Sequence, residues 1–555
     1  MLAGLFSCAF AFAAADIDII DRQRQEVPAP KSLPSLEIVD DRVPAELDQS
    51  LRFTLGGLRV DGASVFSDAE LTGPYRESFG RETSYNRVAA IAGELTKKYR
   101  DAGYLLSRVV LPVEQGALDA RDAHIRLVAI EGYISAVEYE DGGEPELAAR
   151  FKTWWAAIEQ KLLAMRPLKH ADFEREMLLL FDLPGVQISS RFKEAGENSA
   201  TGATVLVIEL RHQALDLSFN AGSTGTSSAG RGIVTVGVGL NSPPFIGGHT
   251  TLSYTQAAHR KEYRSIALGH SHQFANGIIA SLHWARSDSP YPDSDFARLF
   301  DYETKSETLT LGVSYPFIRS RDLNLSAGLS FEHRNSAADL LDTRYTRDRL
   351  RGLTLGLNFD FADEWGGVTQ VLPSFTRGVS WFDATDRDAD ASTPIAPASF
   401  TRAKLHLSRN QSLPGKFSFF AAAETQYSSK ALSSYHRYLL GGSQFGRGYA
   451  IGVIENDRGA AVSLEGRWNM VVAATTVQPF IFIDWGKTWS VDGHDKERLA
   501  SNGIGLRLHG KAPNPITAAQ PGNFSLTVFA AWARREAGDT DKGDHRYMMQ
   551  GVLSF

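Results

Sequence analysis

Few residues of this 555-residue chain have the types and spacing that catalysis or metal binding requires. Residues 221–225 (AGSTG) approach a nucleophile elbow, but the first glycine is absent and the segment follows a strand pattern without opening a helix. His270 and His272 would share one face of a strand, as a metal-binding pair could, yet no third ligand stands at a recognisable spacing. We therefore interpret the first segment as a turn, and we expect no enzymatic activity, no metal site and no cofactor.

Composition narrows the class of protein further. The formal net charge is -7 and the positive charges are scattered, which disfavours nucleic acid as a partner. No uninterrupted apolar run of about 18 residues follows the amino terminus, so helical membrane spans are not expected. Cys8 is the only cysteine, which excludes a disulfide framework. A chain of this length is expected to form two or more domains.

The elements that would position a site are strands in the carboxy-terminal half. In residues 353–361 every second residue is large and apolar, and the residues between them are small or polar. The same alternation recurs in residues 309–315, 323–331, 524–532 and 547–555. Strands of a soluble sandwich are usually about 5 to 6 residues long, whereas alternating runs of about ten suit lipid outside and water inside. We predict an all-β transmembrane barrel of about sixteen antiparallel strands over residues 212–555.

The alternation also assigns charged residues to the barrel lumen. One predicted strand has an apolar row that suits lipid, formed by Val477, Ile481, Ile483 and Trp485. The other parity then places Phe480, Phe482 and Asp484 inside. In the preceding strand the outward row is Val462, Leu464, Trp468 and Met470. Glu465 and Arg467 are therefore expected to face the lumen as well.

The amino-terminal segment predicts export and a short helix. Residues 1–15 form an apolar run that ends in small residues, as a secretory signal peptide requires. Cys8 gives a weak likeness to a lipoprotein processing site, which the continuing apolar sequence disfavours. Residues 16–27 (DIDIIDRQRQEV) are amphipathic and predict a short helix that would plug the barrel, and the prolines of residues 28–51 predict an extended linker. A disordered arm is the alternative for residues 16–51.

Between linker and barrel, residues 52–132 and 133–211 show the same order of strand, helices, strand and strand, an internal repeat of about 80 residues. The first unit has strands at 53–60, 106–113 and 124–131, and its helix 85–99 ends at Gly103. The apolar face of that helix contains Val88, Ile91, Ala92, Leu95 and Tyr99. The second unit has strands at 134–139, 185–192 and 204–210, a long helix at 146–165, and a second helix through Phe173. For Trp154 and Trp155 on the long helix, core packing is favoured over a ligand platform.

Two such units before a barrel resemble the polypeptide-transport-associated (POTRA) domains of two-partner secretion transporters, the outer-membrane partners of haemolysins and filamentous haemagglutinins. Three segments carry local matches. Residues 57–62 (GLRVDG) and 99–104 (YRDAGY) are similar to the first strand and the helix end of the first such domain. Residues 183–186 (LPGV) are similar to a turn of the second.

Residues 441–449 (GGSQFGRGY) resemble the Arg-Gly-Tyr/Phe tip of the long loop that folds into the lumen in this superfamily. The tip residues are Phe445, Gly446, Arg447, Gly448 and Tyr449, and Gly446 replaces a frequent valine, which is expected to loosen the loop. Residues 480–486 (FIFIDWG) match the second half of the signature through Phe480, Phe482, Asp484 and Gly486. The resemblance implies that Asp484 holds Arg447 inside the barrel. A buried guanidinium needs acidic partners, so Glu465 is expected as a weaker second partner. A solvated Arg447 in an extracellular loop is the alternative.

The resemblance implies an outer-membrane pore that exports a partner exoprotein of adhesin, haemolysin or toxin type from periplasm to cell surface, without nucleotide hydrolysis. Cargo would be recognised as an added strand on exposed sheet edges of the periplasmic modules. The predicted edge residues are Leu106, Val109, Leu111, Val186 and Ile188.

Other partners and rival functions follow from the same features. Outer-membrane lipid and lipopolysaccharide would surround the barrel, and the apolar terminal strand ending at Phe555 resembles the signal read by the barrel-assembly machinery. One rival is an insertion or assembly factor of the same superfamily, which would usually carry more periplasmic modules. The second rival is a passive diffusion porin, which would need neither the modules nor the Arg447 loop.

Overall fold

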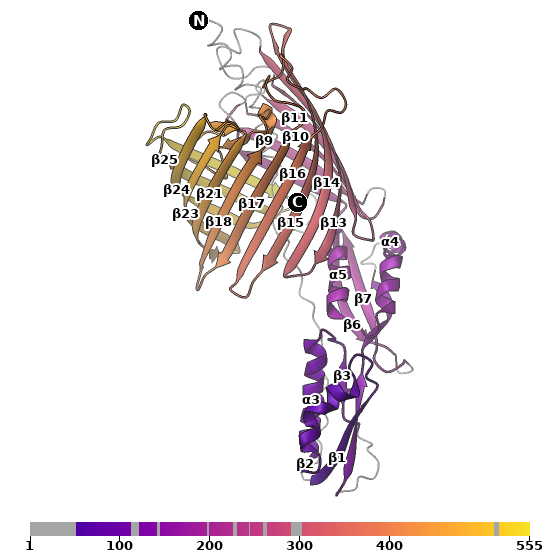
Figure 1. The fold of residues 1–555 in the computed structure, drawn as a ribbon. Coiled ribbons are helices and arrows are strands. Elements are labelled where there is room, and N and C mark those ends of the chain that lie inside the picture. The colour runs from indigo at the N-terminus through magenta and orange to yellow at the C-terminus, as the bar shows by residue number, and fades with distance from the viewer. Residues whose placement is uncertain are drawn as a thin grey trace. The chain divides into compact units, whose positions relative to one another are not determined.

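The structure is a computed structural model that describes residues 52–112, 121–140, 145–196, 199–225, 230–242, 245–258, 263–289, 302–514 and 521–555. These residues form two compact units, which meet in the chain between Gln213 and Ala214 (Figure 1). The predicted signal peptide (1–15), plug helix (16–27) and linker (28–51) lie outside the described residues. None of the described helices combines the length and the apolar character needed to cross a membrane.

The first module contains β1 (Arg52–Asp61), α2 (Asp68–Thr72), η1 (Gly73–Ser78), β2 (Glu82–Ser84), α3 (Tyr85–Asp101), β3 (Arg108–Val110) and β4 (Ala123–Ile130). Its sheet has the order β2-β1-β4-β3, with β1 parallel to β4. Helix α3 begins where the Ser84 side chain accepts a hydrogen bond from the Arg87 amide, and it ends before Gly103, whose φ is +90°. The five residues predicted for its apolar face are all buried, which confirms that prediction.

The strand predicted at 106–113 is wrong in its length, because β3 has only three residues. Leu106 precedes β3 and Leu111 follows it. Pro112 has no amide hydrogen, so it cannot donate a hydrogen bond that would extend β3 toward the carboxy terminus. On the open side of β3, the Thr96 hydroxyl accepts a hydrogen bond from the Val109 amide (2.9 Å). Its single proton faces two acceptors, the Ala92 carbonyl oxygen (2.9 Å) and the Val109 carbonyl oxygen (3.2 Å).

The second module contains β5 (Tyr133–Glu140), α4 (Pro145–Ala164), α5 (His170–Phe181), β6 (Val186–Glu194) and β7 (Ala203–His212), with the sheet order β5-β7-β6. Helix α4 contacts β5 and α5 contacts β6. Trp155 is fully buried and its ring stacks on Phe151, so this tryptophan belongs to the core as predicted. His212, expected as the first barrel residue, is instead the last residue of β7, because it pairs with Val186.

The other compact unit, which follows the two modules in the chain, is a closed antiparallel barrel. Its first half comprises β8 (Leu215–Gly222), β9 (Ile233–Asn241), β10 (Gly248–Ala257), β11 (Arg264–Gln273), β12 (Ile279–Ser289), β13 (Glu303–Arg319), β14 (Leu323–Leu340) and β15 (Thr343–Ala362). Its second half comprises β16 (Gly367–Gly378), β17 (Thr401–Ser412), β18 (Phe417–Ser428), β21 (Arg458–Trp468), β22 (Met470–Val472), β23 (Thr475–Trp489), β24 (Lys496–Ala512), β25 (Gly522–Ala533) and β26 (His545–Ser554). Strand β22 continues β21 past Asn469, and both pair with β23, so the two count as one strand of the barrel wall. The described residues therefore form a sixteen-stranded barrel, as predicted.

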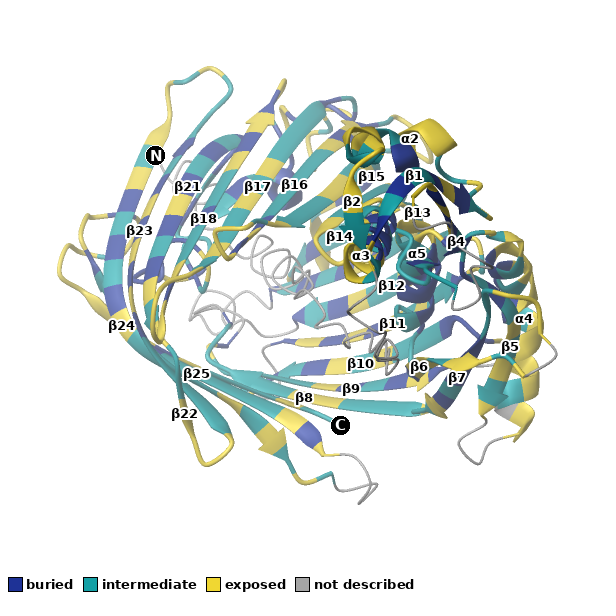
Figure 2. Cartoon of the chain, turned by 90° about the horizontal axis from the view of Figure 1, so that it is seen from below, coloured by how far each residue is buried: buried dark blue, intermediate teal, exposed yellow. Residues whose placement is uncertain are grey.

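The alternation of side chains between the two faces of the wall agrees with the sequence pattern. In β23, Ile481 and Ile483 are exposed on the outside, whereas Phe480, Phe482 and Asp484 are each 3% exposed. Figure 2 shows buried residues alternating with less buried ones along this strand. Strand β21 alternates in the same way, and Glu465 faces inward. A cation or carboxylate on the inner row is therefore presented to whatever occupies the lumen.

Candidate functional site: a loop held inside the barrel

The loop between β18 and β21, residues 429–457, turns into the barrel and does not extend away from it. It contains the short helix η2 (Ser434–His436) and the strand pair β19 (Tyr438–Leu440) and β20 (Ile454–Asn456). Its apolar side chains share one buried cluster with inward-facing residues of the wall. The cluster contains Tyr438, Leu440, Phe445, Tyr449 and Ile454 of the loop with Ala422, Ala461, Leu499, Ala533 and Ala537.

Arg447, at the tip of this loop, is 3% exposed and meets Asp484 as a bidentate pair. Its Nη2 donates to Asp484 Oδ1 (2.7 Å) and its Nε to Oδ2 (3.0 Å), and the Arg447 amide donates to the same Oδ2 (2.9 Å). A second donor bond from Nη2 reaches the Ser463 hydroxyl (2.8 Å). The guanidinium also lies over the Phe482 ring, 3.5 Å from its centroid. Planar, paired donors of this kind match a carboxylate in both energy and geometry.

Glu465 joins this arrangement as a shared acceptor. It accepts from Arg447 Nη1, from Arg467 Nε (2.8 Å) and from Arg507 Nη1 (2.9 Å). Arg467 and Arg507 stack on Phe420 and Phe480, as Arg447 does on Phe482. We call Arg447, Glu465, Arg467, Asp484 and Arg507 the Arg447 cluster. Sequence reasoning missed Ser463 and Arg507, although the inward parity of β21 and β24 would have found both.

The remaining tip residues fix where Arg447 lies. Gly446 has a φ of +79°, a conformation that favours glycine, so this residue forms a defined turn where a loosened loop was expected. A Cβ atom on Gly448 would come within 2.9 Å of the Ala533 amide nitrogen and of Ser501 Cβ. Tyr449 is fully buried, and its hydroxyl lies 2.8 Å from the Arg535 carbonyl oxygen, within hydrogen-bond reach.

Two other predicted residues support the loop from the side. Phe445 packs edge-on to His406 of β17, with 6.3 Å between the ring centroids. Gly486 of β23 lies under Leu440, and a Cβ atom there would come within 2.5 Å of Leu440 Cδ1. The wall therefore lacks a side chain at the place where β19 approaches it.

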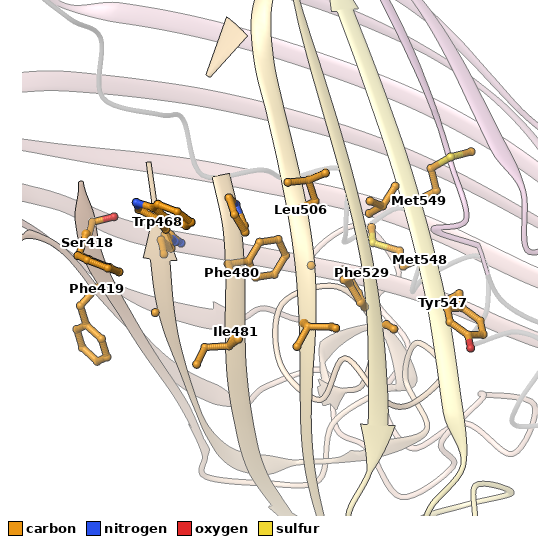
Figure 3. A pocket seen from close by; sticks show the side chains of 18 of the residues that line it. Ser418, Phe419, Trp468, Phe480, Ile481, Leu506, Phe529, Tyr547, Met548 and Met549 are labelled. Carbon is orange, nitrogen blue, oxygen red and sulfur yellow. The ribbon is translucent and has the colours of Figure 1, made fainter. Parts of the chain in front are cut away.

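Two of the other residues considered for chemistry lie elsewhere. Ser223 follows the end of β8, where its hydroxyl accepts from the Met549 amide (3.0 Å). His270 of β11 forms a hydrogen bond with Thr250 of β10, with 2.9 Å between His270 Nδ1 and Thr250 Oγ1. A hollow of about 1070 Å³ lies against the barrel wall where Ile481, Tyr547 and Met549 are exposed (Figure 3). These three residues belong to the outward rows, whereas Arg467 and Phe480, which also line the hollow, belong to the inward rows.

In the residues predicted to bind cargo, the side chain and the backbone have different surroundings. Val109, Val186 and Ile188 are buried in the cores of their modules, and Leu111 packs against the first core. Strands β3 and β6 both stand at sheet edges. These positions can therefore offer main-chain groups at the edges, while their buried side chains serve the module cores.

A closed sixteen-stranded antiparallel barrel with an internal loop, preceded by α/β modules, defines an outer-membrane transport protein. The sequence matches the haemolysin secretion/activation proteins ShlB/FhaC/HecB over residues 202–508, and a POTRA domain of ShlB type over residues 53–132. The chain belongs to this haemolysin secretion/activation family, whose function is the two-partner export of exoproteins through the outer membrane.

Individual relatives agree with this assignment. The chain is 23% identical over 551 residues to the heme/hemopexin transporter protein HuxB of Haemophilus influenzae (strain 86-028NP), covering 95% of this chain and 92% of that protein. It is 23% identical to the outer membrane transporter CdiB of Escherichia coli over 84% of this chain and 79% of that protein. The solved structure of CdiB from Escherichia coli has a TM-score of 0.69 at 20% identity and covers 98% of both chains. CdiB from Acinetobacter baumannii has a TM-score of 0.61 at 16% identity, with 99% of this chain and 98% of that chain covered.

Proposed function

We propose that this protein passes an unfolded exoprotein through its barrel lumen and that the loop 429–457 controls the passage. The observation that carries the proposal is the burial of Arg447 against Asp484 and Glu465 on the inner wall. A porin that only admits small solutes would need no such attachment. No reaction is catalysed and no nucleotide is hydrolysed in this proposal, and folding of the cargo outside the cell drives export.

The Arg447 cluster suits a loop that must be both firmly seated and releasable. All three guanidinium nitrogens and the Arg447 amide donate to the wall. Because these polar contacts converge on one side chain, displacement of Arg447 releases all of them together, and the contacts of Tyr449 are then the polar contacts that still hold the tip. Removing one partner of a buried ion pair typically costs about 3–5 kcal/mol, because the other charge is left without compensation.

Arg447→Ala tests the proposal. We expect export of the partner exoprotein to fall strongly, because Asp484 loses its bidentate partner while Glu465 keeps Arg467 and Arg507. Export is measured by the appearance of the exoprotein at the cell surface, and heat-modifiable mobility on gels confirms that the barrel has formed. Lys430→Ala, which removes an exposed cation from the same loop, is the matched control and should export normally. Normal export by a well-formed Arg447→Ala barrel would remove the cluster from the mechanism.

We further propose that cargo is captured as an added strand on β6. The Gln213 amide donates to the Gly185 carbonyl oxygen (2.7 Å), one position before the register pair Val186 and His212. Gly185 and Gln213 therefore form a hydrogen-bonded pair of the antiparallel ladder. By alternation, Ile188, Ser190 and Phe192 then direct their amide and carbonyl groups away from β7. Among the described residues these groups have no main-chain partner, whereas on β3 the Thr96 hydroxyl accepts from the outward amide of Val109. This difference between β6 and β3 favours the edge of the second module as the site of cargo capture.

Charge on the solvent face of the second sheet agrees with capture through the backbone. Its exposed side chains pair with one another across the strands, as in Arg191 with Glu140 (2.6 Å) and Lys193 with Glu138 (3.3 Å). No large exposed apolar side chain is found among the described residues of the two modules. An extended cargo segment would therefore gain most of its affinity from main-chain hydrogen bonds.

A further inference from the structure

The first residues of the loop 429–457 make a second set of contacts, away from the Arg447 cluster. We call residues 429–437 the loop root and residues 441–453 the loop tip. The Tyr435 hydroxyl donates to Glu332 Oε2 of β14 (3.2 Å), and His436 Nε2 lies 3.5 Å from Glu332 Oε1. The Arg334 guanidinium of β14 lies over the Tyr435 ring, 4.0 Å from its centroid. His436 is 1% exposed, so the histidine of this contact is as deeply buried as Arg447, whereas the Glu332 side chain is partly exposed.

Main-chain contacts seat the root as well. The His436 carbonyl accepts from Gln426 Nε2 of β18 (2.9 Å) and from Arg402 Nη1 of β17 (3.4 Å). The Leu432 amide donates to Asp457 Oδ1 (2.8 Å), which joins the first residues of the loop to its last. The root therefore has several separate attachments.

The polar contacts of the root and of the tip use different strands of the barrel, although the Phe445 ring of the tip also packs against His406 of β17. The root contacts β14, β17 and β18, whereas the polar partners of the tip lie on β21, β23, β24 and β26. The two sets share no wall residue. Loss of the Arg447 contacts thus removes none of the root contacts.

We propose that the root is an independent second attachment, with Glu332 and His436 as its positioning residues, and that it stays seated while the tip moves. The inference rests on the proposed function, in which the tip is displaced during export. It assigns the loop a fixed pivot at η2.

Thiol accessibility tests the independence of the two attachments without requiring export. In a Cys8→Ser background, Ser434→Cys places a thiol on the buried root, since Ser434 is 5% exposed. We expect this thiol to stay unreactive to a maleimide in the Arg447→Ala barrel and to become reactive when Glu332→Ala is introduced. Glu332→Gln keeps an acceptor for Tyr435 and should restore protection in part. Labelling of the Ser434→Cys thiol in the Arg447→Ala barrel would overturn the proposal, because root and tip would then be one unit.

A cross-link tests the pivot during transport. Ser392 of the β16–β17 loop has its hydroxyl 3.2 Å from that of Ser434, so Ser392→Cys with Ser434→Cys can form a disulfide. At the tip, Val453 Cβ lies 4.0 Å from the Cβ position of Gly538, within the usual range of about 3.5–4.5 Å for a disulfide. We expect oxidation to leave export unchanged for the root pair and to stop it, reversibly with reductant, for the Val453→Cys and Gly538→Cys pair. Single-cysteine variants control for the positive φ at Gly538.

The outcomes separate the two ideas. Export blocked by the root cross-link would show that the root moves and would overturn the pivot. Export that continues with the tip cross-linked would instead contradict the proposed function, while the labelling result would still decide whether the root is independent.

Discussion

Arg447 shows why the lumen attachment needs a guanidinium. Its Nε, Nη1 and Nη2 each donate to a different acceptor atom, and its flat face covers Phe482. A lysine would place a single ammonium at the end of a flexible stem and could neither form the paired bonds to Asp484 nor stack in the same plane. Arg447→Lys is therefore expected to behave like the alanine variant in an export assay, although it keeps the charge.

Gly448 is the residue where close packing, without charge, sets the position of the tip. We expect Gly448→Ala to reduce export, because its methyl group would contact Ser501 and the Ala533 amide at 2.9 Å. Overpacking of this kind usually costs about 1–3 kcal/mol. Export and heat-modifiable mobility are measured together. Gly415→Ala, at a described turn with no atom within 4 Å of the added Cβ, controls for loss of a glycine in the barrel, although its positive φ adds some strain of its own. Equal export by Gly448→Ala and wild type would show that the tip tolerates displacement.

At the scale of elements, the two module edges differ in what remains to be paired. On β3 the Thr96 hydroxyl accepts from the outward amide of Val109. Strand β6 runs for nine residues, and the outward main-chain groups of Ile188, Ser190 and Phe192 have no main-chain partner among the described residues. A strand edge that is left unpaired usually serves recognition or carries a risk of aggregation.

Ser190→Pro tests capture by β6. Proline removes the outward amide donor without removing a bond to β7, so binding of an extended cargo segment should weaken. Binding of the secreted partner's amino-terminal part to the periplasmic fragment 52–213 is measured by calorimetry, and export is measured in cells. Ser190→Ala keeps the amide and should bind as wild type does. If Ser190→Pro binds normally, capture by β6 is wrong, and β5 or the helices become the candidates.

The first module also has a pH-dependent element, centred on Glu131. Burial raises the pKa of the Glu131 carboxyl, but hydrogen bonds from Ser64, Val65 and Tyr99 outweigh it, so the net pKa lies below the ordinary value. A lowered folded-state pKa stabilises the fold above the unfolded value of about 4.3 and loses this contribution as pH falls through the folded value. The melting temperature of fragment 52–213 should therefore fall on acidification, and less steeply in Glu131→Gln. Glu77→Gln, at an exposed glutamate, should follow the wild-type pH profile. Parallel profiles for Glu131→Gln and wild type would contradict this role.

At the scale of the whole molecule, the period-two alternation of apolar and polar residues made the barrel predictable. In every strand of the wall, alternate side chains point toward lipid and toward the lumen. The helix face of α3 was predictable for the same reason, from a period of 3.6. The loop contacts were not, since a pairing such as Tyr435 with Glu332 joins residues 103 positions apart and leaves no periodic trace. The contact of Thr96 with the β3 edge was not predictable either, because it comes from a side chain of another element, which no local pattern reports.

The Arg447 cluster also has an electrical consequence for the passing chain. With the tip seated, the cluster holds three guanidinium groups and two carboxylates, a local charge of +1. In the proposed mechanism Arg447 leaves with the tip, so two arginines and two carboxylates would remain on the wall and the local charge would be zero. At this level of the channel we therefore expect neither acidic nor basic segments of the passing polypeptide to be held by charge.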